Sequence, residues 1–203
     1  MADLRLKRAI AAHTSIYTDH KQGVEFLDFD EVMRHTPTRM ALNESVADIV
    51  ALYKVDHLVL PDARGFLFAP VADSLCISFQ QARKKGKLPG DLVSMSLIDR
   101  EYDGKNGDVL EMAKIDLTGK RVAVIDDVLA TGGTAATTVR MIRALNGTPV
   151  LMVAVYEVDG LDGRGLLQRE NVAVECLMTL SEVRDLRAKQ KLPVAKTKTL
   201  VPS

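Results

Sequence analysis

Short apolar runs alternate with amphipathic stretches along most of the chain. Val46, Ile49, Val50 and Tyr53 recur at roughly helical spacing, which indicates an amphipathic helix. The run 57–61, which ends at a proline, is instead typical of a short buried strand. The pattern predicts, in chain order, a helix over 38–53, a strand over 57–61, a helix over 66–76, strands over 76–79 and 121–126, a helix over 134–145 and a strand over 150–155.

This alternation predicts an α/β fold with a mostly parallel sheet flanked by helices on both faces. Residues 38–187 would form that core, and sheets of this kind bind ligands at the carboxyl ends of their strands. We expect residues 1–37 to be irregular and to form a small N-terminal hood over the sheet. Residues 94–108 are polar and interrupted by glycines, which predicts a flexible functional loop. Residues 188–203 contain four lysines and no acid, which predicts a solvated tail.

Composition narrows the class of protein. The chain has 203 residues, 47% of them hydrophobic and 27% charged, which suits a soluble globular protein rather than a disordered one. Lysine plus arginine balances aspartate plus glutamate at 27 each, so we expect neither nucleic acid nor a membrane surface as partner. We find no window long enough for a membrane span and no signal-peptide pattern. Cys76 and Cys176 have no metal-binding spacing and are expected to be buried reduced thiols, so we predict a cytoplasmic protein.

The segment 122–134 carries the clearest chemistry. Asp126 and Asp127 follow four apolar residues and mark the expected end of a strand. A tight turn then opens the next helix and contains Ala130, Thr131, Gly132, Gly133 and Thr134. Glycines let the backbone approach an anion closely, and the helix N-terminus adds a partial positive charge. The turn therefore predicts a site for a phosphate monoester.

The two carboxylates add a second requirement. They cannot bind phosphate, but they can accept hydrogen bonds from a vicinal diol about one sugar ring away from it. A phosphate beside a diol describes a 5-phosphoribosyl group. A Walker P-loop is excluded because GxxxxGK[ST] does not occur, 160–165 does not match GxGxxG, and the chain contains neither GxSxG nor HExxH.

The segment 122–134 resembles the phosphoribosyl pyrophosphate (PRPP) motif of the type I phosphoribosyltransferases. Other segments make the chain most similar to the adenine phosphoribosyltransferases within that group. They are Asp62-Ala63-Arg64-Gly65, similar to the family's pyrophosphate loop; Arg83-Lys84-Lys85-Gly86-Lys87-Leu88-Pro89, similar to R-K-x-G-K-L-P; Glu101-Tyr102 of the catalytic loop; and Leu161-Asp162-Gly163-Arg164. The similarity runs in register from about Gly23 to about Leu180 and implies the type I phosphoribosyltransferase fold.

The resemblance also implies an activity: purine salvage, in which adenine and PRPP give AMP and pyrophosphate. Glu101 would be the catalytic residue, and Asp126, Asp127 and the turn 130–134 would bind the ribose and its phosphate. The implied pyrophosphate contacts are Asp62, Ala63, Arg64, Arg83, Lys84 and Lys87, with a cis peptide in the 62–65 segment. Mg²⁺ would be held mainly through the substrate rather than by a metal site of the protein, and the implied assembly is a homodimer.

The part expected to contact the base departs from the family pattern. Where the adenine enzymes read P-G-x-x-F-R-D, this chain has Gln22, Glu25 and Leu27 in place of proline, an apolar residue and arginine. The residues expected to bind the base are Val24, Glu25, Phe26, Leu27 and Leu161. Two alternatives to an adenine enzyme therefore remain: the same chemistry on another purine or analogue, or a nucleotide-sensing protein without turnover.

Overall fold

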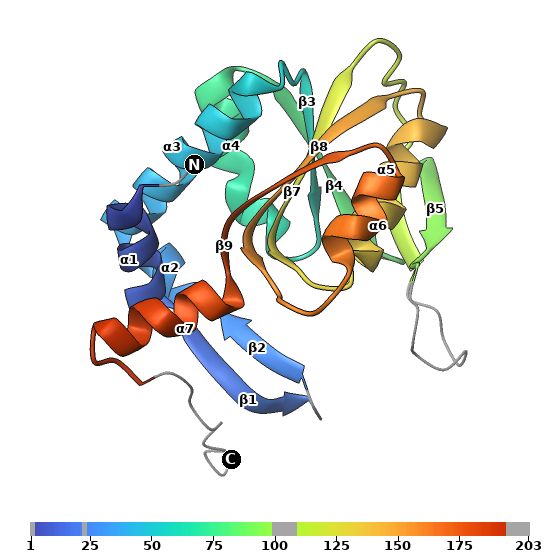
Figure 1. The fold of residues 1–203 in the computed structure, drawn as a ribbon. Coiled ribbons are helices and arrows are strands. Elements are labelled where there is room, and N and C mark those ends of the chain that lie inside the picture. Colours follow the sequence, from blue (N-terminus) through green and yellow to red (C-terminus); the bar gives the residue numbers. More distant parts are fainter. Residues whose placement is uncertain (1–2, 22–23, 99–108, 194–203) are drawn as a thin grey trace.

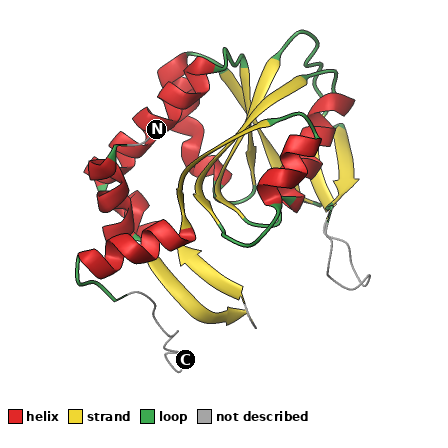
Figure 2. Cartoon of the chain, in the orientation of Figure 1, coloured by secondary structure: helices red, strands yellow, loops and turns green. Residues whose placement is uncertain are grey.

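The computed structural model describes residues 3–21, 24–98 and 109–193, and it places the chain around one central sheet (Figures 1 and 2). Within these residues, seven strands lie in the order β5-β6-β4-β3-β7-β8-β9. Their bounds are β3 His57–Pro61, β4 Ser78–Lys84, β5 Leu92–Ser96, β6 Val109–Ala113, β7 Arg121–Leu129, β8 Thr148–Glu157 and β9 Ala173–Thr179. β4, β3, β7, β8 and β9 run parallel, whereas β6 pairs antiparallel with β4 and with β5. The expected mostly parallel sheet is confirmed.

Helices cover both faces of this sheet (Figure 2). α3 (Thr36–Leu52) and α4 (Ala69–Leu75) pack on one face, and α5 (Gly133–Ala144) and α6 (Gly163–Arg169) pack on the other. The alternation of side chains along β7 divides the core accordingly. Ala123 and Ile125 belong to the cluster under α3 and α4, and Val122 and Val124 belong to the cluster under α5. Both faces of β7 are buried, which is why its sequence is a continuous apolar run.

The N-terminal hood is not irregular, and that expectation is wrong. It contains α1 (Leu4–His13), an antiparallel pair of β1 (Ser15–Lys21) and β2 (Val24–Asp28), and α2 (Asp30–Arg34). α7 (Leu180–Lys189) packs beside α1. The buried Arg187 guanidinium donates to the carbonyls of Ala11 and Thr14, and the Tyr156 and Thr14 hydroxyls lie 2.6 Å apart. Long-range contacts from the core therefore give the hood an order that its local sequence pattern does not indicate.

Several element boundaries also differ from the expected ones. The helix expected over 66–76 divides into a 3-10 turn, η1 (Gly65–Phe68), and α4, because Pro70 is in the first turn of the α-helix. Cys76 ends α4 with a positive φ of 52°, so β4 starts only at Ser78, but it extends to Lys84. β7 runs on to Leu129, so the two aspartates lie inside the strand rather than at its end.

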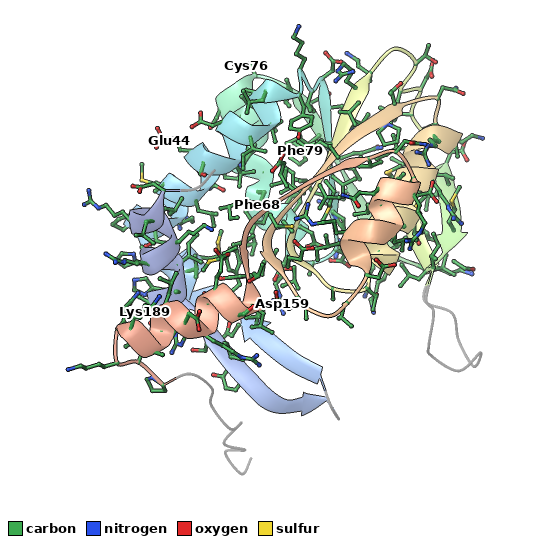
Figure 3. The ribbon with its side chains drawn as sticks, in the orientation of Figure 1. Glu44, Phe68, Cys76, Phe79, Asp159 and Lys189 are labelled. Carbon is green, nitrogen blue, oxygen red and sulfur yellow. The ribbon has the colours of Figure 1, made fainter. Side chains whose placement is uncertain are left out.

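The expectation that both cysteines are buried is also wrong. Both are free thiols, but Cys76 is exposed at the end of α4 (Figure 3), and Cys176 is only partly buried. Burial raises the pKa of the Cys176 thiol to about 12, and the nearby Glu157 carboxylate contributes to this rise. In the described ranges, no helix is long and apolar enough to cross a membrane.

Candidate functional site

A carboxylate pair and an arginine meet near the carboxyl end of β7. Arg64 follows β3, and its Nη1 donates to Asp127 Oδ2 at 2.5 Å and to the Leu27 carbonyl at 3.0 Å. Asp126 Oδ1 in turn accepts the backbone N–H of Asp127 at 2.9 Å. Parallel pairing of β3 with β7 brings the two strand ends together. The arginine therefore links the carboxylate pair to the hood.

The two aspartates have different electrostatic environments. Burial raises the pKa of the Asp126 carboxyl well above its usual range, and the neighbouring charge of Asp127 raises it further. The Asp127 N–H and the Arg64 charge oppose this shift only in part. Arg64 therefore pairs with Asp127, whereas burial and the neighbouring carboxylate disfavour the charged form of Asp126. A carboxyl group accepts hydrogen bonds and, when protonated, also donates one, which suits recognition of a sugar hydroxyl.

The turn between β7 and α5 encloses a pocket of about 100 Å³. Its lining includes Asp126, Val128 and the whole turn Ala130–Thr134. Gly132 has a φ of 83°, a left-handed conformation that favours glycine, and Gly133 starts the helix. The first N–H groups of α5 have no partner within the helix, and together with the helix dipole they attract an anion. The pocket thus has the chemistry expected for a phosphate.

Gly163, in α6, allows the helix to pack closely against this turn. A Cβ on Gly163, the first residue of α6, would lie 2.3 Å from the Ala130 carbonyl oxygen and 3.1 Å from the Gly132 nitrogen. Only a glycine at this position lets α6 approach the turn so closely. Gly163 lies within one of the segments that resemble the family, but its residue type alone does not indicate this role.

A second pocket, of about 220 Å³, lies beside the segment that follows β3. It is lined by Leu60, Asp62, Ala63, Phe66, Gln81 and Arg83. The peptide bond between Asp62 and Ala63 is cis, as the resemblance implied for this segment. Arg83 Nε is 3.5 Å from Asp62 Oδ2, so the end of β4 contacts this segment directly. A Cβ on Gly65 would lie 2.7 Å from the Ile125 carbonyl oxygen, which accounts for the glycine here.

The structure brings together part of the residues predicted from the sequence. Asp126, Asp127, Arg64 and the turn 130–134 lie at adjacent strand ends, and Arg83 joins them through Asp62. Lys84 and Lys87 are exposed at the end of β4 and in the turn after it. Leu161 is exposed just before α6.

The residues expected to contact the base are only partly described. Leu27 is buried, so its side chain packs in the core and only its carbonyl reaches Arg64. Val24, Glu25 and Phe26 belong to β2, but their side chains are outside the described part of the structure. Glu101 is in the range 99–108, which is outside the described residues altogether. Sequence reasoning missed the Leu27 carbonyl, because a backbone acceptor leaves no trace in residue type.

The donor set fits Mg²⁺ only in combination with a substrate. The described residues contain no group of three or more histidine, cysteine, aspartate or glutamate side chains that could bind a metal ion. Asp126 and Asp127 supply hard carboxylate oxygens, the ligand type that Mg²⁺ prefers, but Asp127 Oδ2 is already bound by Arg64. Mg²⁺ usually keeps several ligands from water and substrate phosphates.

An anion-binding turn beside a carboxylate pair, at the carboxyl ends of parallel strands, defines an α/β protein that binds a phosphorylated sugar. Residues 28–180 match the phosphoribosyl transferase domain family. An adenine phosphoribosyltransferase from Clostridium kluyveri is 38% identical over 154 residues, which cover 75% of this chain and 87% of that protein. The chain belongs to the phosphoribosyltransferase family, and the resemblance inferred from its sequence is confirmed.

Solved structures agree with this assignment. The crystal structure of adenine phosphoribosyltransferase from Thermoanaerobacter pseudethanolicus has a TM-score of 0.78 and 31% identity, covering 85% of this chain and 99% of its own. The enzyme from Saccharomyces cerevisiae, solved with D-DIAB and adenine, has a TM-score of 0.75 and 29% identity, covering 86% of this chain and 99% of its own. The type I phosphoribosyltransferase fold expected from the sequence is therefore confirmed.

Proposed function

We propose that this protein transfers the phosphoribosyl group of PRPP to N9 of adenine and releases pyrophosphate and AMP. The bond from ribose C1 to the pyrophosphate oxygen breaks, the bond from C1 to N9 forms, and the N9 proton leaves the base. The observation that carries the proposal is the phosphate-sized turn pocket directly beside Asp126 and Asp127. Adenine is favoured as the base because similar proteins carry the name adenine phosphoribosyltransferase.

The turn and the carboxylates would have separate tasks. The N–H groups of Thr131–Thr134 bind the 5-phosphate and fix one end of the sugar, away from the bond that breaks. Asp126 and Asp127 bind the ribose hydroxyls. Negative charge on this pair also stabilises the positive charge that develops on the ribose ring as pyrophosphate departs.

The pyrophosphate would leave toward the second pocket. Asp62 and Ala63 line this pocket, Arg64 follows them in the chain, and the cations Arg83, Lys84 and Lys87 balance the charge of the leaving group. The base would lie against residues 24–27 and Leu161, and Glu101 would manage the N9 proton. Mg²⁺, bound chiefly through PRPP with support from the carboxylate pair, supplies neutralisation of the phosphate charge.

The proposal extends to assembly and location. Phe66 on η1 and Phe79 on β4 are both exposed, and their ring centroids lie 5.9 Å apart beside the second pocket. We propose that a second copy of the chain covers this aromatic pair in a homodimer. Free Cys76, which is exposed, suits a reducing compartment such as the cytoplasm.

The decisive experiment is a base panel. Purified protein with Mg²⁺ and PRPP is incubated separately with adenine, hypoxanthine, guanine and xanthine, and nucleotide and pyrophosphate are both quantified. We expect AMP and pyrophosphate in equal amounts from adenine. Turnover with another base alone would overturn the adenine assignment. PRPP or AMP binding by calorimetry, without product from any base, would overturn the enzymatic proposal in favour of a nucleotide sensor.

A further inference from the structure

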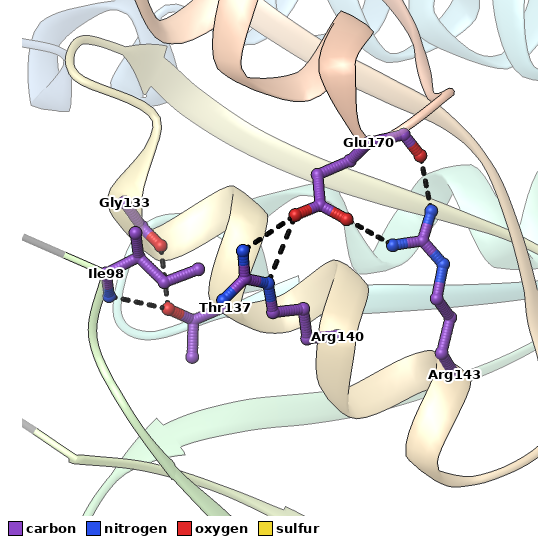
Figure 4. Close-up of polar contacts among 6 residues, drawn as sticks. All are labelled: Ile98, Gly133, Thr137, Arg140, Arg143 and Glu170. Atoms are coloured by element: carbon purple, nitrogen blue, oxygen red, sulfur yellow. Dashed lines mark hydrogen bonds and ion pairs between the residues drawn. The ribbon is translucent and has the colours of Figure 1, made fainter.

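Thr137 lies one turn into α5 and has two hydrogen-bond partners from different elements (Figure 4). Its hydroxyl donates to the Gly133 carbonyl at 2.8 Å, and its oxygen accepts the backbone N–H of Ile98 at 3.0 Å. The side chain is buried, so these bonds do not compete with bulk water. Donation to the carbonyl four residues earlier is common for a helical threonine, but acceptance from a separate strand end is not required by the helix.

The Ile98 carbonyl is fixed at the same place. An ideal Cβ on Gly133 would lie 2.4 Å from the Ile98 oxygen, so the peptide of Ile98 packs directly against the first residue of α5. Gly133 is also part of the turn that lines the phosphate pocket. Ile98, just beyond the end of β5, is therefore fixed beside the phosphate turn by two contacts: a hydrogen bond to Thr137 and close packing against Gly133.

α5 is itself a fixed reference for this contact. Further along the helix, Glu170 accepts from Arg140 Nε at 3.1 Å and from Arg140 Nη2 at 2.9 Å (Figure 4). Arg143 donates to the same carboxylate and to the Glu170 carbonyl. The two arginines lower the pKa of Glu170 and keep it charged. α5 also packs Val139, Met141 and Ile142 into the core, so we expect a displacement between Ile98 and α5 to move the end of β5 rather than the helix.

We propose that Thr137 is a positioning residue for the transferase reaction. Its hydroxyl fixes the position of Ile98, just after β5, relative to the phosphate turn. Thr137 is not among the residues that line the phosphate pocket, so it acts through Ile98 and Gly133. This inference rests on the proposed function, because the segment after Ile98 contains Glu101. If Ile98 were displaced, turnover would fall, whereas binding of the 5-phosphate would stay intact.

Thr138 provides a matched control on the same helix. Its hydroxyl donates to the Thr134 carbonyl at 2.8 Å, and it is as buried as Thr137, but no bond from it to β5 is found in the part of the chain that the structure describes. Thr137→Ala and Thr137→Val remove the hydroxyl, Thr137→Val keeps the shape, and Thr137→Ser restores the oxygen. Thr138→Ala removes an equivalent helical hydroxyl without touching Ile98.

The first readout is amide hydrogen exchange at Ile98, followed by NMR. We expect the protection of this amide to fall in Thr137→Ala and Thr137→Val and to persist in Thr137→Ser and Thr138→Ala. The second readout is steady-state kinetics. Loss of one hydrogen bond predicts a kcat about three- to tenfold lower in the first two variants, with the KM for PRPP within about twofold of the wild type.

The outcomes separate this inference from the proposed function. A wild type that forms no nucleotide overturns the proposed function and the catalytic meaning of Thr137, whereas the Ile98 exchange data still test the contact. An active wild type with Thr137→Val equal to Thr138→Ala in kcat overturns the positioning role. A rise in the KM for PRPP with unchanged kcat also overturns it, because Thr137 would then act on phosphate binding.

Discussion

Arg64 connects the carboxylate pair to the hood. Its guanidinium pairs with Asp127, whereas burial raises the pKa of the Asp126 carboxyl. The same guanidinium donates to the Leu27 carbonyl, so the charge balance is connected to the hood. One arginine therefore contacts both the carboxylate pair and β2 of the hood.

The first prediction concerns Asp127→Asn. An amide in place of the carboxylate removes a charge-assisted hydrogen bond to Arg64 and weakens stabilisation of the cationic ribose. Hydrogen bonds to charged groups contribute about 1.5–3 kcal/mol, which predicts a loss of roughly 10- to 100-fold in kcat/KM for PRPP. Asp91→Asn is the control, because Asp91 forms an exposed pair with Lys114 at 3.6 Å. Equal kinetics for the two variants would contradict the assigned role of Asp127.

The second prediction concerns the pH dependence of folding stability at His57. The imidazole is buried, its Nδ1 is 2.7 Å from Ser78 Oγ, and no partner of Nε2 is found among the described residues. Burial lowers the pKa of His57, and the charge of Lys120 lowers it further. The folded state therefore binds fewer protons than the unfolded state below pH ~6.5, so stability falls as the pH drops through that value toward the folded pKa.

Urea unfolding at several pH values tests this. Between about pH 7 and pH 5, the wild type should lose stability relative to His57→Asn, since the variant lacks the titrating group. Ser78→Ala keeps the buried imidazole and should keep the pH dependence. Asp126, whose raised pKa acts in the opposite direction, is present in all three proteins and cancels in the comparison. Parallel pH profiles for the wild type and His57→Asn would refute the prediction.

At the scale of elements, sequence patterns predicted the central strands and their helices best. β3, β7 and β8 are apolar runs buried on both faces, and their positions followed from the sequence. The phosphate turn was predicted because glycines and threonines at a strand-to-helix junction are typical of anion-binding turns. The sequence did not predict that the two aspartates lie inside β7, because β7 continues to Leu129 through its pairing with β8.

The elements missed by sequence reasoning depend on distant partners. β5 and β6 have mixed polarity because they form the antiparallel edge of the sheet, and only β6 pairs with β4. The hood strands pair with each other, and the chain just before β1 is bound by Arg187 and Tyr156 from other parts of the chain. The contact of the Leu27 carbonyl with Arg64 was missed for the same reason. Backbone acceptors and long-range contacts carry no local periodicity, so a single sequence does not reveal them.

The third prediction tests how α6 supports the phosphate turn. Gly163→Ala places a Cβ 2.3 Å from the Ala130 carbonyl, so the turn or the helix must move. We expect a loss of about 1–3 kcal/mol in the free energy of unfolding and a raised KM for PRPP. Gly165→Ala is the matched control in the same helix, because the atoms nearest to its Cβ belong to the side chains of Asp162 and Arg169 rather than to the backbone of the turn. An unchanged KM in Gly163→Ala would contradict the role of Gly163 in shaping the turn.

At the scale of the whole molecule, the second pocket lies beside an exposed aromatic side chain, Phe66, which contacts the exposed Phe79. Arg83 and Asp62 are neighbours of the exposed Phe66 and Phe79, so a second copy covering the aromatic pair would also approach the proposed pyrophosphate path. Exposed aromatic side chains of this kind are enriched at protein interfaces and depleted on free surfaces. Assembly and catalysis would then share one face of the sheet.

The fourth prediction follows from that shared face. Phe79→Asp puts a charge at the centre of the proposed interface and should convert the wild-type dimer to a monomer in light scattering, with kcat/KM for PRPP reduced as well. Leu52→Asp is the control: Leu52 is 81% exposed at the end of α3 and is not part of the aromatic pair, so the substitution should leave the dimer intact. A monomeric wild type would refute the homodimer. A dimeric Phe79→Asp variant would place the interface elsewhere, and the pyrophosphate path would then be complete within one chain.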